Sequence, residues 1–118
     1  MNMNLITEPL VLQAVKAMSD NDRAAWMALF SKDAVVTDDG KPHDFTDWSD
    51  TEVFGKKRAY VVLGKSRGYF TSIKRVTNNG TFIYGKFHSD RWGELDVFSH
   101  FHVRDGKIVR LDVGQVKQ

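Results

Sequence analysis

The stretch LDVFSHFHVRDGKIVRLDV, residues 95–113, decides the fold. Apolar and polar residues alternate on either side of Asp105-Gly106, and this pattern predicts a β-hairpin with one buried face. That face carries Leu95, Val97, Phe101, Val103, Val109, Leu111 and Val113, with Ser99 as its polar member. Ile108 falls on the other, mixed face. The apolar face has the composition of a pocket wall as much as of a core.

The turn sets the register of this hairpin. A two-residue Asp-Gly turn would mix polar with apolar faces, because side chains alternate with a period of two. A three-residue loop, Arg104-Asp105-Gly106, with a left-handed glycine in a bulge, keeps the apolar face whole. We therefore predict the three-residue loop, which places Ser99 opposite Leu111.

Length and composition indicate one ordinary globular domain. The chain has 118 residues, enough to bury a real core. Hydrophobic residues make up 42% and charged residues 27% of it. A net charge of +2 is too small to favour nucleic acid or an anionic membrane as a partner. Cysteine is absent, which excludes disulfides and thiolate metal sites. We find no secretory signal or membrane span and expect a cytoplasmic protein.

Three helices are predicted before the main run of strands. Thr7 caps the first helix, which has Glu8-Pro9 in its opening turn and extends to Met18. A second helix spans Arg23 to Phe30, and a third spans Lys56 to about Lys65.

The acidic segment Lys41 to Glu52 fits no regular period, and Pro42 disfavours a helix at its start. We interpret it as a loop. Two roles stay open for it: a solvated acidic connection, or a lid that closes over a site.

The strands complete an α+β pattern. A short strand, Ala34–Val36, ends at Thr37-Asp38, and a hairpin joins residues 70–77 to 81–88 through Asn79-Gly80. That hairpin pairs Val76 with Ile83. The order predicts a cone-shaped, curved antiparallel sheet with three N-terminal helical segments packed on its concave face. Such an arrangement encloses a conical cavity.

The segment DRAAWMALFSKDAVVTD, residues 22–38, resembles the helix–strand opening of the nuclear transport factor 2-like (NTF2-like) superfamily. This superfamily includes the SnoaL-like polyketide cyclases and the ketosteroid isomerases. Phe54-Gly55 and the segment VRDGKIV, residues 103–109, match two further marks, and residues 41–53 look like an insertion. The resemblance implies one cone-shaped domain over residues 1–118, usually a homodimer, with an apolar pocket at its open end. It specifies the fold better than the activity.

The resemblance implies a catalytic role for Asp38, which matches the position of the general base in isomerases of this group. A carboxylate in an apolar pocket has its charged form desolvated, which makes it a usable proton shuttle. The family's oxyanion acid is replaced here by Ser99, and its helix tyrosine by Ala14, so we do not expect steroid isomerisation. Ser99 can donate one hydrogen bond, and Tyr60 or Tyr84 another. The alternative for Asp38 is an ordinary rim acid in an acidic loop.

The expected ligand is a small apolar molecule. As its lining we predict Met18, Trp26, Phe30, Tyr60, Tyr84, Phe101, Leu111 and Val113.

His100 and His102 form an HxH pair on the outer sheet face, a spacing that suits two metal ligands. No second carboxylate–histidine cluster follows at a useful distance, so we predict no metal and no cofactor. We interpret the outer face as the surface of a homodimer, with Phe98 and Ile108 as its apolar contacts.

Three functions remain open. In the first, the protein is a SnoaL-like enzyme in which Asp38 removes a proton from a carbon acid and Ser99 or a tyrosine polarises the carbonyl; isomerisation, cyclisation and dehydration all fit. In the second, the same cavity binds a small ligand without catalysis. In the third, the domain serves dimerisation alone.

Overall fold

The computed structural model describes residues 2–55 and 67–116. Within them, a short 3-10 turn, η1 (Met3–Leu5), precedes the helices α1 (Pro9–Ser19), α2 (Arg23–Leu29) and α3 (Phe45–Glu52). The strands are β1 (Phe30–Asp38), β2 (Lys41–Asp44), β3 (Gly68–Thr77), β4 (Phe82–Ser89), β5 (Gly93–Arg104) and β6 (Lys107–Gln115). They form one sheet in the order β2-β1-β6-β5-β4-β3.

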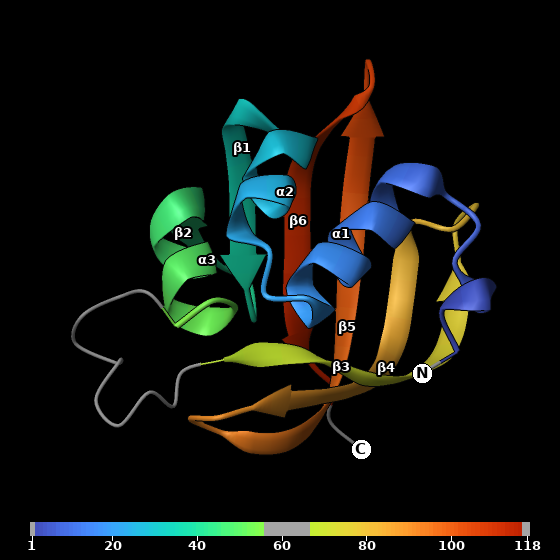
Figure 1. Cartoon of the computed structure of the whole chain (residues 1–118), viewed down its shortest axis with the longest axis vertical. Helices are drawn as coiled ribbons and strands as arrows, with labels where there is room; N and C mark the ends of the chain where they lie inside the picture. Colours follow the sequence, from blue (N-terminus) through green and yellow to red (C-terminus); the bar gives the residue numbers. More distant parts are fainter. Residues whose placement is uncertain (1, 56–66, 117–118) are drawn as a thin grey trace.

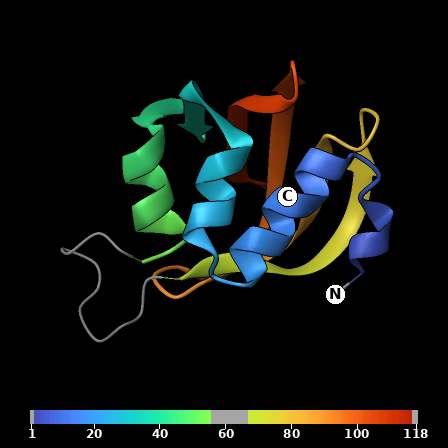
Figure 2. The same cartoon turned by 45° about the horizontal axis from the view of Figure 1, so that its top comes forward.

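The sheet is curved, and the helices lie over its concave face (Figures 1 and 2). Strands β3 to β6 form an antiparallel meander, as predicted. Strand β1 pairs with β2 in an antiparallel manner and with β6 in parallel, so the first and last long strands lie side by side. The predicted α+β class, with helices on the concave face of a curved sheet, is confirmed.

Side-chain carboxylates cap the N-termini of the first two helices. Glu8, not Thr7, caps α1: its carboxylate accepts hydrogen bonds from the backbone N–H groups of Leu10 at 2.6 Å and Val11 at 3.0 Å. Asp22 caps α2 by accepting from the N–H of Ala25 at 3.0 Å. Each cap satisfies donors that the first helical turn leaves unpaired.

The prediction of a loop over residues 41–52 is wrong. Residues 41–44 form β2, which pairs with the end of β1, and residues 45–52 form α3. The Asp44 carboxylate caps α3 by accepting from the N–H of Asp47 at 2.9 Å. Trp48 and Ser49 are buried, and the Ser49 hydroxyl accepts a hydrogen bond from the indole of Trp26 at 3.0 Å. Packing against α2 therefore holds this segment in place.

The predicted turn of the β5–β6 hairpin is also wrong. The turn has two residues, Asp105 with a φ of 52° and Gly106 with a φ of 76°, as a type I′ turn requires. Ser99 lies opposite Val113 instead of Leu111. Val109 is an extra residue at a bulge, which returns the apolar side chains to one face.

This bulge has a second consequence: Ile108 is fully buried in the core, although the sequence pattern placed it on the outer face. It lies opposite Val103 near the turn. Ile108 is therefore unavailable as a contact on the outer surface.

The β3–β4 hairpin has the predicted register, with Val76 opposite Ile83. The pairing shifts twice along β3, between Phe70 and Ser72 and again farther on. Gly85 permits the close approach there, because a Cβ atom on it would lie 2.1 Å from the carbonyl oxygen of Ser72. The helix predicted at residues 56–65 lies outside the described residues.

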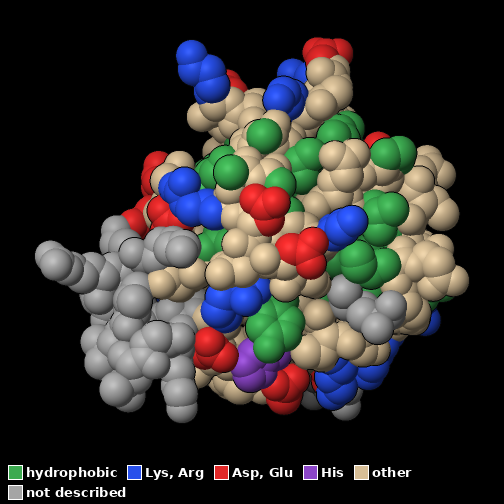
Figure 3. Space-filling model, viewed as in Figure 1, with side chains coloured by type: hydrophobic (Ala, Val, Ile, Leu, Met, Phe, Trp, Pro, Cys, Tyr) green, Lys and Arg blue, Asp and Glu red, His purple; other side chains and the backbone are tan. Residues whose placement is uncertain are grey.

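One hydrophobic core lies between the helices and the sheet. Its most deeply buried large residues include Val11, Val15, Trp26, Phe70, Ile73, Ile83, Phe101, Ile108 and Leu111. On the surface that carries the helices, hydrophobic side chains are interrupted by acidic and basic ones (Figure 3). Within the described part of the chain, no helix combines the length and the apolar character that crossing a bilayer would require.

Candidate functional site

A row of inward-facing residues crosses the sheet and provides the floor of the site. Ser99 of β5 lies opposite Val113 of β6, and Val113 lies beside Asp38 of β1. Neighbouring strands are separated by about 4.8 Å, so the Asp38 and Ser99 backbones lie roughly 10 Å apart with one valine between them. The alternation of the strands thus places two polar groups on an otherwise apolar row.

A cavity of about 380 Å³ opens above this row. Its lining comprises Met18, Asp38, Asp39, Trp48, Glu52, Phe87, Ser89, Trp92, Leu95, Val97, Ser99, Leu111, Val113, Gly114 and Gln115. Most of these side chains are apolar or aromatic, and carboxylates gather on the β1 and α3 side. A cavity of this size and composition suits a small, mainly apolar molecule with a few polar groups.

Asp38 is held at the end of β1 by a residue of α3. The indole N–H of Trp48 donates a hydrogen bond to Asp38 Oδ2 at 3.0 Å. Its second carboxylate oxygen takes no part in that bond. Trp48 is nearly buried, so its ring forms part of the cavity wall while its polar edge orients the acid.

Glu52 places a further carboxylate in the cavity, beside those of Asp38 and Asp39 and one helical turn after Trp48. Burial raises the pKa of its carboxyl group; the positive charge of Arg91 opposes the rise, and the negative charge of Asp38 adds to it. Arg91 Nη1 lies 3.2 Å from Glu52 Oε1. A carboxyl group with a raised pKa is a better proton donor near neutral pH than an ordinary one.

The β4–β5 turn forms one edge of the cavity mouth. Ser89 lines the cavity, and its hydroxyl accepts hydrogen bonds from the backbone N–H groups of Arg91 at 3.2 Å and Trp92 at 3.0 Å. Trp92 also lines the cavity although the residue is 60% exposed. The Arg91 guanidinium lies 4.7 Å from the centre of that ring. An aromatic ring is therefore presented at the entrance, where a ligand would pass.

The residues predicted for the site divide into four groups, of which the last is Tyr84 alone. Met18, Asp38, Ser99, Leu111 and Val113 line the cavity. Trp26, Phe30 and Phe101 do not: they are buried in the adjacent core, where Trp26 packs on Phe30 with ring centres 4.8 Å apart. Tyr60 lies outside the described residues.

The prediction that Tyr84 lines the cavity is wrong. Ile83 points into the core, so the alternation along β4 sends Tyr84 to the outer face, away from the cavity. There it lines a shallow groove with Arg75, Thr77, Phe82, Phe98 and Val116. Tyr84 therefore cannot polarise a ligand held at Asp38.

Trp48, Glu52 and Trp92 line the cavity but were not predicted as site residues from the sequence. The first two belong to the segment interpreted as a loop. A usable signal was present: Asp44 is a capping residue, and Phe45, Trp48, Ser49 and Glu52 follow it at helical spacing. Trp92 lies in a turn, where no periodic pattern points to its role.

No protein-family model and no curated protein matches the sequence. Solved structures do match the fold over nearly the whole chain. An NTF2-like protein from Cytophaga hutchinsonii superimposes with a TM-score of 0.63 at 12% identity, covering 96% of this chain and 92% of that one. This chain has the NTF2-like fold.

Two other solved structures that match the chain carry more specific descriptions. A putative polyketide cyclase from Sinorhizobium meliloti matches with a TM-score of 0.64 and 24% identity, over 96% of this chain and 98% of that chain. TerC, crystallised with polyporic acid, matches with a TM-score of 0.62 and 13% identity, over 92% and 89% of the two chains. At these identities the likeness concerns the fold alone.

Proposed function

We propose that the protein binds a small, mainly apolar molecule in the cavity and transfers a proton on it, with Asp38 as the base. The observation that carries the proposal is the position of Asp38: it lines an apolar cavity and is oriented by the indole of Trp48. A carboxylate fixed in this way is suited to removing a proton from a carbon beside a carbonyl group.

Two groups are available to polarise that carbonyl. Ser99 lies on the same row of the sheet, across Val113, and its hydroxyl is a hydrogen-bond donor. Glu52 also lines the cavity, and burial raises the pKa of its carboxyl group, which favours the protonated form that can donate a hydrogen bond. The separation of Asp38 from Ser99 fits a rigid ligand of one or two rings that presents a carbonyl to one and an acidic carbon to the other.

Two of the solved structures that match the fold support this class of ligand by analogy. One is described as a putative polyketide cyclase and another was crystallised with polyporic acid. Isomerisation, cyclisation and dehydration all begin with the same proton abstraction, so the proposal covers that shared step.

The proposal is tested with prodan, a neutral fluorescent naphthyl ketone that carries exchangeable hydrogens beside its carbonyl. We expect the wild-type protein to bind prodan with a blue-shifted emission and to accelerate deuterium incorporation at that carbon in D2O. Asp38→Asn should keep the binding and reduce the exchange by about a hundredfold or more. Asp33→Asn is the matched control, because Asp33 lies exposed on the same strand. Val113→Phe, which fills the cavity, should abolish binding.

A non-catalytic binding protein is the second candidate. The pairing of both carboxylates with structural partners favours it: Asp38 with Trp48, and Glu52 with Arg91. Prodan binding without accelerated exchange, unchanged in Asp38→Asn, would identify this function and exclude the first. Failure of the wild type to bind, with Val113→Phe identical to it, would contradict both.

We also propose that the protein forms a homodimer through the outer sheet face. On this face the rings of Phe82 and Phe98 stack with centres 5.6 Å apart, and Tyr84 lies in the same groove. Stacked aromatic rings beside a tyrosine are typical of interface cores. Sedimentation should give a dimer for the wild type and a monomer for Phe98→Glu. Leu5→Glu, at an exposed apolar residue of η1, should leave the dimer intact.

A further inference from the structure

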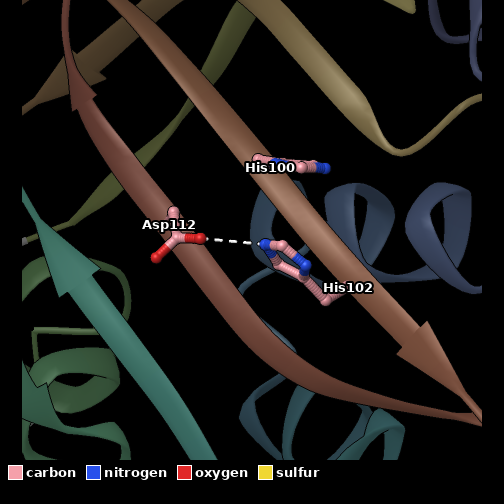
Figure 4. A group of neighbouring side chains, drawn as sticks. All are labelled: His100, His102 and Asp112. Carbon is pink, nitrogen blue, oxygen red and sulfur yellow. Dashed lines mark hydrogen bonds and ion pairs between the residues drawn. The ribbon is translucent and has the colours of Figure 1, made fainter. Parts of the chain in front are cut away.

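The outer face of the sheet brings together three side chains that are ligands for metals. His100 and His102 project from β5 on the side opposite to Ser99, and Asp112 of β6 lies directly across from His100. One potential ligand atom from each residue lies within 4.8 Å of the other two. In Figure 4, His102 of β5 and Asp112 of β6 point toward one another. His100 lies beside His102 on β5. The strand pairing thus adds a third ligand to the HxH pair.

We propose that His100, His102 and Asp112 bind a divalent transition-metal ion of the zinc class. Imidazole nitrogen and carboxylate oxygen are ligands that zinc takes in proteins, whereas magnesium and calcium prefer sets of oxygen atoms. Three protein ligands leave a fourth tetrahedral position open to water or another ligand. The site lies on the opposite side of the sheet from the cavity and is independent of the function proposed there.

A neighbouring strand already orients the carboxylate of this site. The Thr37 hydroxyl of β1 donates a hydrogen bond to Asp112 Oδ1 at 2.6 Å. Asp112 Oδ2 then faces His102, whose Nε2 lies 2.9 Å away. The centre of the His100 ring lies 4.2 Å from that of His102. Outer hydrogen bonds of the kind made by Thr37 fix the direction of a metal ligand and strengthen its affinity.

The charge states of Asp112 and His100 agree with this geometry. Burial would raise the pKa of Asp112, but hydrogen bonds from Arg110, Thr37 and His102 outweigh it and hold the pKa at about 2. Burial lowers the pKa of His100, and the neighbouring His102 lowers it further. Metals bind the ionised carboxylate and the neutral imidazole.

Arg110 is the main competitor for the carboxylate. Its Nε lies 3.0 and 3.1 Å from the two oxygens of Asp112. Its side chain is 46% exposed and has solvent to move into, and surface ion pairs of this kind are weak. The three ligand atoms must also draw together to the roughly 3.4 Å separation that bonds of about 2.0–2.1 Å in a tetrahedral site imply. Rotation of half-exposed side chains can provide this.

Calorimetric titration of the untagged protein with zinc chloride, in a buffer that does not chelate, tests the proposal. We expect saturable binding of one ion per chain. His102→Ala and Asp112→Asn should weaken it by at least the ~10–100-fold that follows loss of an outer-shell partner. Thr37→Val, which removes such a partner, should weaken it by roughly tenfold. Arg110→Gln should bind at least as tightly as the wild type, because a competing positive charge is gone.

His88→Ala is the matched control, because His88 also contacts two carboxylates, Asp90 and Glu94, but lies away from the proposed site. It should bind zinc like the wild type. Circular dichroism establishes that each variant folds, and His102→Asn replaces His102→Ala if the alanine variant does not. Absence of saturable binding, binding unchanged in the His102 or Asp112 variants, or equal loss in His88→Ala would overturn the proposal.

Discussion

The indole N–H of Trp48 donates a hydrogen bond to the carboxylate of Asp38 at 3.0 Å, and this bond connects α3 to the end of β1. Trp48 belongs to the segment that was predicted to be a loop, and Asp38 is the base in the proposed reaction. Both residues line the cavity. The bond therefore has two separable consequences, one for stability and one for the orientation of the acid.

The first prediction concerns the energy of this bond. Trp48→Phe keeps most of the buried aromatic surface and removes the donor. In a double-mutant cycle with Asp38→Ala, which removes the acceptor, unfolding in urea should reveal a coupling free energy of about 1–2 kcal/mol, at or below the ~1.5–3 kcal/mol of a hydrogen bond to a charged group because the acceptor is partly exposed. Additive effects of the two substitutions would show that the bond contributes nothing to stability.

Trp48→Phe also has a functional consequence. Prodan binding should persist, because the apolar wall is kept, while the rate of deuterium exchange falls toward that of Asp38→Asn. Loss of orientation is the physical reason, since a small displacement of a base from its proton reduces the rate steeply. An exchange rate equal to that of the wild type would mean that Trp48 does not position the acid.

A second prediction concerns the buried pair Trp26 and Ser49. Both residues are fully buried, and the Ser49 hydroxyl accepts the indole hydrogen bond at 3.0 Å. Ser49→Ala leaves a buried donor unsatisfied and should lower the free energy of unfolding by about 1–3 kcal/mol. Ser31→Ala is the control, because the buried hydroxyl of Ser31 has no hydrogen-bond partner among the described residues. That variant should stay within about 0.5 kcal/mol of the wild type.

A third prediction concerns the pH dependence of stability near the β4–β5 turn. Hydrogen bonds to Glu94 and then to Asp90 raise the pKa of His88 above its ordinary value of 6.5. A raised pKa in the folded state means that the contribution to stability is complete below pH 6.5 and is lost as the pH rises through the folded-state value. The stability difference between wild type and His88→Gln should therefore shrink from mildly acidic to alkaline pH in urea titrations. A constant difference would contradict this assignment.

In the β5–β6 hairpin, alternation predicted the inward-facing residues beyond the bulge, but it misplaced Ile108 and did not predict which residues lie opposite one another. Ser99 faces the cavity as expected, yet its partner is Val113, because Val109 is inserted at a bulge. Beyond the bulge the register differs from the predicted one by two residues, which leaves the faces of Leu111 and Val113 unchanged, so a pattern with a period of two cannot detect it. The same bulge turned Ile108 inward.

The candidate site was only half accessible from the sequence. Asp38 and Ser99 lie on strands whose alternation and family resemblance pointed to the cavity. Trp48 and Glu52 lie on the short helix α3, which also contains two aspartates and contacts Trp26 through Phe45 and Ser49. A helix this short has little intrinsic stability, so local pattern alone predicts it poorly. The pairing of Asp112 with the histidines depends on the same unpredicted register.

The last prediction concerns Glu52, which the structure adds to the cavity. Burial raises its pKa above the ordinary value of 4.5, against the opposing charge of Arg91 and with a further increase from Asp38. For a carboxyl group with a raised folded-state pKa, the stabilising contribution is complete below pH 4.5 and is lost as the pH rises through the folded-state value. Glu52→Gln stays neutral at every pH and keeps an oxygen for Arg91. The wild type should therefore lose stability relative to Glu52→Gln as the pH rises from about 4 to 7, measured by urea unfolding at several pH values.

Asp33→Asn, at an exposed carboxyl group, should show no such trend. A difference between wild type and Glu52→Gln that does not change over this range would place the Glu52 carboxyl in water and remove it from the proposed chemistry.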